Sequence, residues 1–120
     1  MKTAIIGATP NQGRYAYMAA ERLQSKELEF VPIGIKKGEV FGRPILNIDS
    51  APKLEDIHTV TMYVGAYHFQ GYEDYILGLK PKRIIFNPGS ENPVLEQKAE
   101  AQGIDIVHGC TLVMLGTGQY

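Results

Sequence analysis

Residues that can bind an anion gather near the start of the chain, in the loop Gly7-Ala-Thr-Pro-Asn-Gln-Gly-Arg14. The loop follows the apolar run Ala4–Ile6, which is typical of a strand buried in a parallel sheet. It precedes apolar residues at the spacing of the inner face of an amphipathic helix: Ala16, Ala19, Ala20 and Leu23. Free N–H groups and the positive dipole end make a helix N-terminus favourable for anions. The sequence therefore predicts a phosphate site in this loop.

Within this loop, Thr9, Asn11 and Arg14 are the side chains suited to an anion. Thr9 and Asn11 can each cap the following helix or donate to a phosphate oxygen, and Arg14 can pair with the charge. The loop lacks the dinucleotide fingerprint G-x-G-x-x-G, because Thr9 and Gln12 occupy its second and third glycine positions. A tight strand-to-helix connection without a ligand is the alternative interpretation.

The elements that must position these residues alternate between strand and helix patterns, which predicts a parallel, doubly wound α/β sheet with right-handed crossovers. Further strands are expected at 28–33, 44–47, 59–64, 83–87 and 104–108. A brief helical turn is expected near 51–56, with Ser50 as a candidate cap. Helices are expected over 72–79 and from Pro93, capped by Asn92, to Gly103. Ligands of such sheets bind beyond the carboxyl ends of the strands. The candidate site therefore consists of the segments that follow the strands: Gly7–Arg14, Gly34–Lys37, Gly65–His68, Asn87–Asn92 and His108–Thr111.

Length and composition narrow the class of protein. The 120 residues suit one domain spanning 1–120, with 44% hydrophobic and 21% charged residues. The net charge of −1 argues against a general nucleic-acid or membrane-surface binder. Cys110 is the only cysteine, so no disulfide can form within the chain, which suits a reducing compartment. Lys2 leads directly into an expected strand, which argues against a signal peptide. No apolar run approaches the ~20 residues of a membrane span. These features predict a cytoplasmic protein.

Three motifs connect the chain to a known family. The first loop follows the pattern Gly-Ala-Ser-Pro-Asn-x-Gly-Arg/Lys, with Thr9 in place of serine. Asn87-Pro-Gly-Ser-Glu-Asn92 follows x-Pro-Gly-x-Glu-Asn, and Gly103-Ile-Asp-Ile-Val-His-Gly-Cys110 follows Gly-Ile-x-Val-Val-x-x-x-Cys. The chain thereby resembles the small stand-alone CoA-binding domains, which are related to the N-terminal domain of the succinyl-CoA synthetase alpha subunit. It departs from them at Val64-Gly-Ala-Tyr-His-Phe69, where the family has a Val-Pro-Pro-like turn.

A basic pair, Lys36 and Lys37, follows the second expected strand. NAD-binding domains carry an acidic residue at this point for the ribose 2′-hydroxyl, whereas here the first carboxylate is Glu39. Two lysines suit an extra phosphate, either the 3′-phosphate of CoA or the 2′-phosphate of NADP. The alternative is a solvated surface pair.

Two later loops supply further candidates. Tyr67 and His68 can stack on an adenine or close over a pantetheine arm, although Tyr67 can equally pack inward. His68 has no neighbour in sequence to orient it as a general base. Asn87–Asn92 has the composition of a turn, and its position after a strand favours a wall of the ligand site, with Gly89 allowing close approach.

Cys110 and His108 have the spacing of a nucleophile and a base on one strand face. No third orienting residue is evident, and a lone cysteine is usually a small buried residue, so catalysis is not expected. The histidines His58, His68 and His108 also lack metal-ligand spacing.

The resemblance implies a Rossmann-like fold that binds CoA or an acyl-CoA without catalysis of its own. A protein partner or a homodimer is compatible with such a role. Two alternatives stay open: an NADP-dependent oxidoreductase fragment, which would lack a substrate domain and a Tyr-x-x-x-Lys pair, and an interaction protein that has lost its ligand. The residues expected to bind the ligand come from four segments: Gly7, Ala8, Thr9, Pro10, Asn11, Gly13, Arg14, Tyr15, Gly34, Lys36, Lys37, Val64, Gly65, Tyr67, Asn87, Pro88, Gly89, Ser90 and Asn92.

Overall fold

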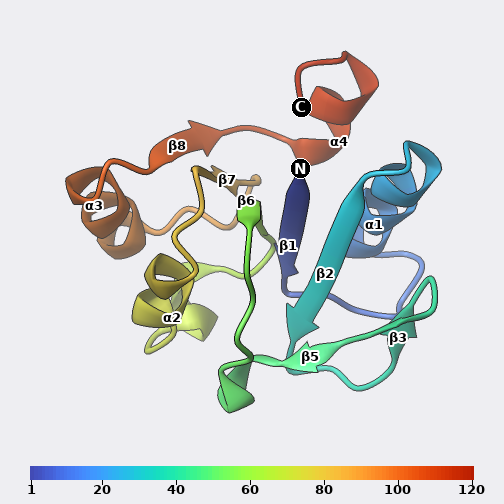
Figure 1. Cartoon of the computed structure of the whole chain (residues 1–120), viewed down its shortest axis with the longest axis horizontal. Coiled ribbons are helices and arrows are strands. Elements are labelled where there is room, and N and C mark those ends of the chain that lie inside the picture. Colours follow the sequence, from blue (N-terminus) through green and yellow to red (C-terminus); the bar gives the residue numbers. More distant parts are fainter.

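The computed structural model describes residues 1–120 and contains a six-stranded sheet in the order β5-β2-β1-β6-β7-β8 (Figure 1). All of its strand pairs are parallel. Taken along the chain, this order is 3-2-1-4-5-6, so it reverses between β1 and β6. The predicted doubly wound α/β fold is confirmed. The strands are β1 (Lys2–Ile6), β2 (Glu29–Gly34), β5 (Leu46–Asn47), β6 (Ile57–Met62), β7 (Arg83–Phe86) and β8 (Asp105–His108).

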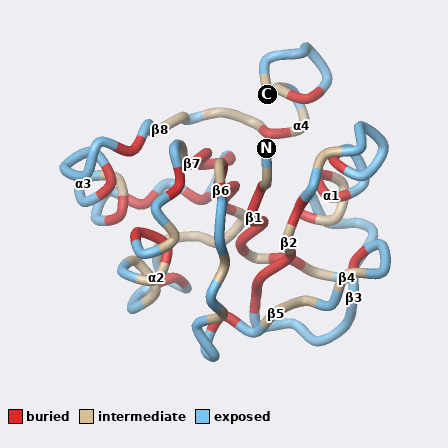
Figure 2. The backbone as a smooth tube through the Cα atoms, viewed as in Figure 1, coloured by how far each residue is buried: buried red, intermediate tan, exposed pale blue.

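Helices cover both faces of the sheet. On one face, α1 (Tyr15–Ser25) contacts α4 (Thr111–Gly116), and on the other α2 (Glu73–Gly78) contacts α3 (Pro93–Ala101). Successive side chains of a strand point to opposite faces, so Ile5 packs with the α1 side and Ile6 with the α2 side. Burial is therefore concentrated along the central strands, as Figure 2 shows. The inner face predicted for α1 is confirmed, because its buried residues are Ala16, Ala19, Ala20 and Leu23.

The connection between β2 and β5 differs from the prediction. The expected strand at 44–47 is divided: β4 (Arg43–Pro44) forms an antiparallel hairpin with β3 (Glu39–Val40), and only β5 joins the main sheet. Phe41 and Gly42, with φ of 50° and 79°, make the turn. A left-handed Phe is uncommon, so no sequence pattern predicted this hairpin.

The prediction of a brief helical turn near 51–56, with Ser50 as its candidate cap, is wrong. A 3-10 turn, η1 (Ile48–Ser50), comes earlier, and Asn47 caps it by accepting a hydrogen bond from the N–H of Asp49 at 2.8 Å. Ala51 has φ of 46° and ends the turn, and Pro52 follows it. The left-handed residue and the proline together prevent the turn from continuing as a helix.

The second half of the chain follows the prediction more closely. Asn92 caps α3 by accepting from the N–H of Leu95 at 3.1 Å, with Pro93 in the first turn, as expected. Strand β6 begins two residues before its predicted start. The sequence interpretation missed two short helices, α4 and the 3-10 turn η2 (Ala66–Phe69).

The last residues return to the start of β1, and the two termini lie close together in Figure 1. The Tyr120 hydroxyl lies 2.6 Å from the Thr3 hydroxyl, and its ring lies under the Arg83 guanidinium at 4.6 Å. These contacts hold the tail at the amino edge of the sheet, away from the carboxyl ends where ligands bind. No helix is both long and apolar enough to cross a bilayer.

Candidate functional site

A cleft of about 630 Å³ lies at the carboxyl ends of the central strands, where the strand order reverses. This volume falls within the range of about 300–1,000 Å³ typical of small-molecule sites. The cleft is formed by the first loop and the start of α1, by the ends of β2 and β6, and by segments near α2 and β7. Its lining residues are Ile6, Gly7, Ala8, Thr9, Asn11, Gly13, Arg14, Tyr15, Ala16, Gly34, Ile35, Lys36, Ile48, Tyr63, Val64, Gly65, His68, Phe69, Tyr72, Pro88, Gly89 and Ser90.

The N-terminus of α1 opens into this cleft. Arg14 is the N-cap and provides no side-chain cap, so the N–H groups of Tyr15 and Ala16 have no hydrogen-bond partner in the protein. Arg14, Tyr15 and Ala16 all line the cleft. Free amides at the positive end of an eleven-residue helix are the donors that an anion requires.

Thr9 and Asn11 do not cap the helix, and that part of the prediction is wrong. The Thr9 hydroxyl accepts from the N–H of Asn11 at 3.2 Å, and the Asn11 side-chain oxygen accepts from the N–H of Gly13 at 3.0 Å. Short polar side chains commonly bond to backbone two residues onward in this way. Both side chains shape the loop and leave the end of α1 uncapped.

Two glycines allow the loop to lie against its neighbouring strands. Gly7 has φ of +93°, and a Cβ at Gly34 would lie 3.1 Å from the Ala8 carbonyl oxygen. The N–H groups of Gly7 and Ala8 both donate to the carbonyl of Ile33. The ends of β1 and β2 are therefore fixed together beneath the cleft.

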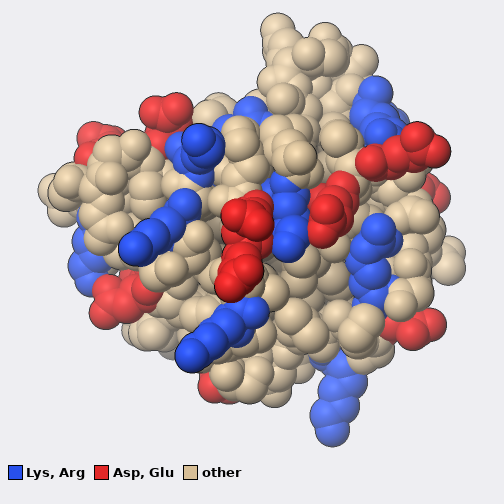
Figure 3. Space-filling view, viewed as in Figure 1, with Lys and Arg blue, Asp and Glu red and all other residues tan.

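The charge of the cleft is positive although the protein carries a net charge of −1. Arg14 and Lys36 are among the lining residues, and no Asp or Glu is. Basic and acidic side chains are interspersed over the face drawn in Figure 3, so the surface there has no single sign. An anionic ligand is thus attracted by the local charge of the cleft.

Five of the predicted site residues do not line the cleft: Pro10, Lys37, Tyr67, Asn87 and Asn92. Pro10 packs against Gly38, and Lys37 is exposed beside its lining neighbour Lys36. The Tyr67 side chain points to solvent, with 81% of the residue exposed. The other fourteen predicted residues all line the cleft.

Asn87 is buried and has a structural role. Its side-chain nitrogen donates to the Thr61 hydroxyl at 2.7 Å and to the Met62 carbonyl, and its oxygen accepts from the N–H of Thr111 at 2.8 Å. Thr61 and Thr111 are in turn hydrogen-bonded to each other. This buried network joins β6, the end of β7 and the start of α4. It therefore fixes the position of Asn87, where the 87–92 loop begins.

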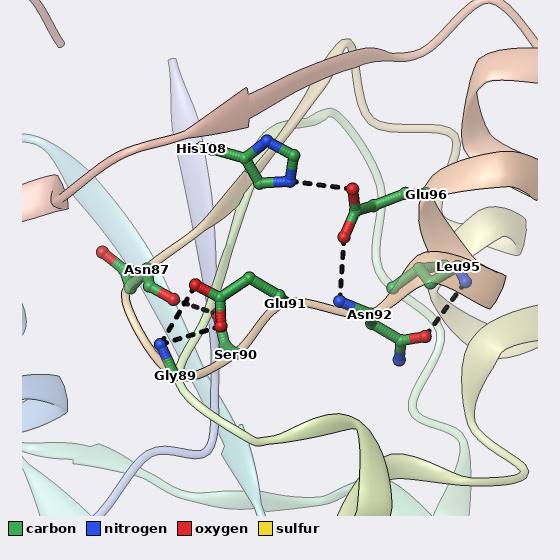
Figure 4. A network of polar contacts seen from close by, with 8 residues as sticks. All are labelled: Asn87, Gly89, Ser90, Glu91, Asn92, Leu95, Glu96 and His108. Carbon is green, nitrogen blue, oxygen red and sulfur yellow. Dashed lines mark hydrogen bonds and ion pairs between the residues drawn. The ribbon is translucent and has the colours of Figure 1, made fainter.

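The rest of that loop is held from both sides, as Figure 4 shows. The Glu91 carboxylate accepts from the N–H of Gly89 at 3.0 Å, and the Glu96 carboxylate accepts from the N–H of Asn92 at 2.9 Å. Glu96 also contacts His108, with 2.8 Å between Oε1 and Nε2. Glu96 is the orienting neighbour of His108 that the sequence did not reveal.

Eight lining residues are absent from the list of residues expected to bind the ligand, although Ile35 and His68 lie in two of the candidate segments. The eight are Ile6, Ala16, Ile35, Ile48, Tyr63, His68, Phe69 and Tyr72. Most of them are apolar side chains that form the wall of the cleft. Ile48 and Tyr72 lie far apart in sequence, and the Tyr72 hydroxyl donates to Asp49. Only the fold brings them together, whereas Ile35 lies within the candidate segment Gly34–Lys37 and Ala16 directly follows the predicted residue Tyr15.

Tyr63 stands at the end of β6 with its hydroxyl buried near Thr61 and Thr111 but not hydrogen-bonded. Burial raises the pKa of Tyr63 to about 12, above the value of 10 in an unfolded chain. A raised pKa means that the folded state favours the neutral phenol. The contribution of the Tyr63 phenol to the free energy of unfolding is therefore present in full below pH 10 and is lost as the pH rises toward 12.

We therefore expect a smaller alkaline loss of stability in Tyr63→Phe. The free energy of unfolding should fall less between pH 10 and 12 than in the wild type, by on the order of 2 kcal/mol. Urea unfolding at a series of pH values measures this. Tyr67→Phe, at the 81% exposed position, is the control and should follow the wild-type curve. An equal fall in the free energy of unfolding of Tyr63→Phe and of the wild type would contradict the raised pKa of Tyr63.

A doubly wound parallel sheet with a cleft at its switch point places the protein in the Rossmann-like class of α/β folds. Within that class, the chain belongs to the CoA binding domain family, whose sequence profile matches residues 1–116. The resemblance found in the three loop motifs is thereby confirmed. The family assignment supports CoA as the kind of small molecule that the protein binds. No curated protein matches the sequence.

Solved structures show the same fold. A protein described as uncharacterized, known from a crystal structure, is 53% identical, covers 99% of this chain and 97% of its own, and has a TM-score of 0.95. A hypothetical protein from Pyrococcus horikoshii OT3 is 23% identical, covers 96% and 81%, and has a TM-score of 0.81. A Thermus thermophilus protein is 18% identical, covers 99% and 90%, and also has a TM-score of 0.81. The latter two support the fold alone.

Proposed function

We propose that the cleft binds CoA or an acyl-CoA and performs no chemistry of its own. The observation that carries this proposal is the charge of the lining: two cations and two free backbone amides, with no carboxylate. Together with membership of the CoA binding domain family, this favours a ligand that carries several phosphates. A protein that binds without catalysis would sense or carry its ligand, or present it to a partner protein.

The residues of the cleft divide naturally between the parts of such a ligand. The diphosphate would accept from the N–H groups of Tyr15 and Ala16 and pair with Arg14. Lys36 would meet the phosphate of the adenosine. The walls at Val64–Gly65 and Pro88–Ser90 would flank the remainder of the groove. CoA itself supplies only a thiol that carries an acyl group, and the protein would supply binding and orientation.

Calorimetric titration with CoA, NADP and NAD in one buffer tests the proposal directly. Saturable binding of CoA, tighter than that of both nicotinamide cofactors, is the expected result. Tighter NADP binding would replace the proposal with the alternative in which Lys36 meets a 2′-phosphate. Absence of binding by all three would favour an interaction protein that has lost its ligand.

The two neighbouring lysines provide a matched pair of variants. Lys36 lines the cleft and Lys37 does not, although the sequence had assigned both to a phosphate. Lys36→Ala is expected to weaken CoA binding about tenfold, the effect of losing one charge-assisted contact, whereas Lys37→Ala should change it less than about twofold. Lys36→Ala should weaken dephospho-CoA less than CoA. Equal losses of affinity for CoA and dephospho-CoA would mean that Lys36 does not contact the adenosine phosphate.

A further inference from the structure

The three histidines of the chain differ in what their side chains contact. His58 is hydrogen-bonded to the Thr59 hydroxyl at 2.8 Å, and His108 is paired with Glu96. The His68 ring has no hydrogen-bond or ion-pair partner in the protein, and His68 is the one histidine that lines the cleft. An exposed imidazole with both nitrogens free is available to a ligand.

The turn that carries His68 is firmly held. Its N–H donates to the Gly65 carbonyl at 3.0 Å, and the following residue, Phe69, is only 2% exposed and anchors the turn in the core. A Cβ on Gly65 would lie 3.3 Å from the Gly89 carbonyl oxygen, so the turn packs closely against the 87–92 loop. The Tyr67 ring contacts the imidazole edge to face, with centroids 5.3 Å apart. His68 is thus held at the wall of the cleft.

We propose that His68 is a third cationic residue of this site, which in its imidazolium form donates a hydrogen bond to an anionic phosphate oxygen of the ligand. The inference rests on the proposed function and adds a pH-dependent contact to it. It concerns the Val64–Phe69 turn, where this chain departs from the Val-Pro-Pro-like pattern. A bound anion favours the charged form of a histidine, so binding would be coupled to proton uptake.

The protein presents no anion of its own to His68 within the cleft. The charged residues that share the cleft with it are Arg14 and Lys36, which favour the same anion. The remaining titratable groups of the cleft are the neutral phenols of Tyr15, Tyr63 and Tyr72. A phosphate entering the cleft would therefore be the main anion that an imidazolium there can meet.

The carboxylates on the elements packed around the turn have partners of their own. Asp49 accepts from the Tyr72 hydroxyl, and Glu91 accepts from the N–H of Gly89. On α2, Glu73 accepts from the N–H of Gly71, and Asp74 lies 3.7 Å from the ammonium of Lys98. None of these carboxylates lines the cleft, so none competes with a ligand for His68.

The test compares wild type with His68→Gln by calorimetric titration of CoA at pH 6 and pH 8, the range in which histidines change charge. Wild type is expected to bind CoA about tenfold more tightly than His68→Gln at pH 6 and within about twofold at pH 8. The comparison cancels the titration of the ligand's own phosphate. His58→Gln, in β6 at the amino edge of the sheet, is the control and should match the wild type at both pH values.

Proton uptake gives a second readout, obtained by repeating the titrations in buffers of different ionisation enthalpy. Wild type should take up more protons than His68→Gln on binding CoA. If dephospho-CoA shows the same difference, the contacted group belongs to the diphosphate, and if the difference disappears, it belongs to the adenosine phosphate. Equal affinity of the two proteins at pH 6, or an equal loss at both pH values, would overturn the proposal. If wild type fails to bind CoA, the proposed function falls, and the same comparison with inorganic diphosphate decides the role of His68.

Discussion

Gly7→Ala is expected to lower the free energy of unfolding by about 3 kcal/mol, because two separate costs meet at this residue. Gly7 has φ of +93°, which L-amino acids rarely adopt. The added Cβ would also lie 2.7 Å from Cγ2 of Val64 and 3.0 Å from the Tyr63 carbonyl oxygen. The second contact is with the backbone directly after β6, and this backbone cannot move without disturbing the sheet. Urea unfolding of both proteins measures the loss.

Gly71→Ala separates the two costs. Gly71 has φ of +96°, yet a Cβ there would meet nothing within 4 Å. It should therefore show only the backbone strain, about 1 kcal/mol, and the difference between the two variants gives the cost of crowding at the switch point. Similar losses in both variants would mean that the ends of β1 and β6 can separate, and that the floor of the cleft is less rigid than its contacts indicate.

The fold could be predicted from sequence wherever a local pattern and a tertiary requirement coincide. The spacing of Ala16, Ala19, Ala20 and Leu23 specifies both a helix and its buried face, and Asn92-Pro93 specifies a helix start in any context. The β3–β4 hairpin could not be predicted in this way. It depends on a left-handed Phe41, whose ring packs 5.1 Å from that of Tyr17 on α1, and that contact exists only after folding.

The candidate site was predictable to the extent that parallel strands bring their carboxyl ends to one edge. That rule alone placed Gly7–Arg14 beside Gly34 and Pro88–Ser90, and the structure brings them together in one cleft. It could not separate Lys36 from Lys37, because the direction of a side chain after a strand depends on how the chain turns. It also could not show that Asn87 is turned inward to Thr61 and Thr111.

Gly13→Leu is expected to weaken CoA binding at least about a hundredfold, or about 2.7 kcal/mol, while leaving the fold intact. Gly13 lines the cleft beside the free N–H groups of Tyr15 and Ala16. A Cβ there would touch only the Asn11 side-chain oxygen, at an ordinary 3.4 Å, and Gly13 is not among the residues of positive φ. The leucine is therefore expected to extend into the space where a phosphate must approach the end of α1, from a Cβ that does not crowd the protein.

Two controls make the Gly13→Leu result specific to the site. Gly78→Leu adds the same side chain at the end of α2, where a Cβ meets nothing within 4 Å, and should bind CoA as the wild type does. Gly13→Ala projects less far into the cleft and should fall between the wild type and Gly13→Leu. Urea unfolding of Gly13→Leu should match the wild type to within about 1 kcal/mol, because a Cβ there makes no short contact and the backbone has no positive φ. If folded Gly13→Leu bound CoA as tightly as the wild type, the phosphate would not lie at the N-terminus of α1. The helix N-terminus would then not have the role proposed for it.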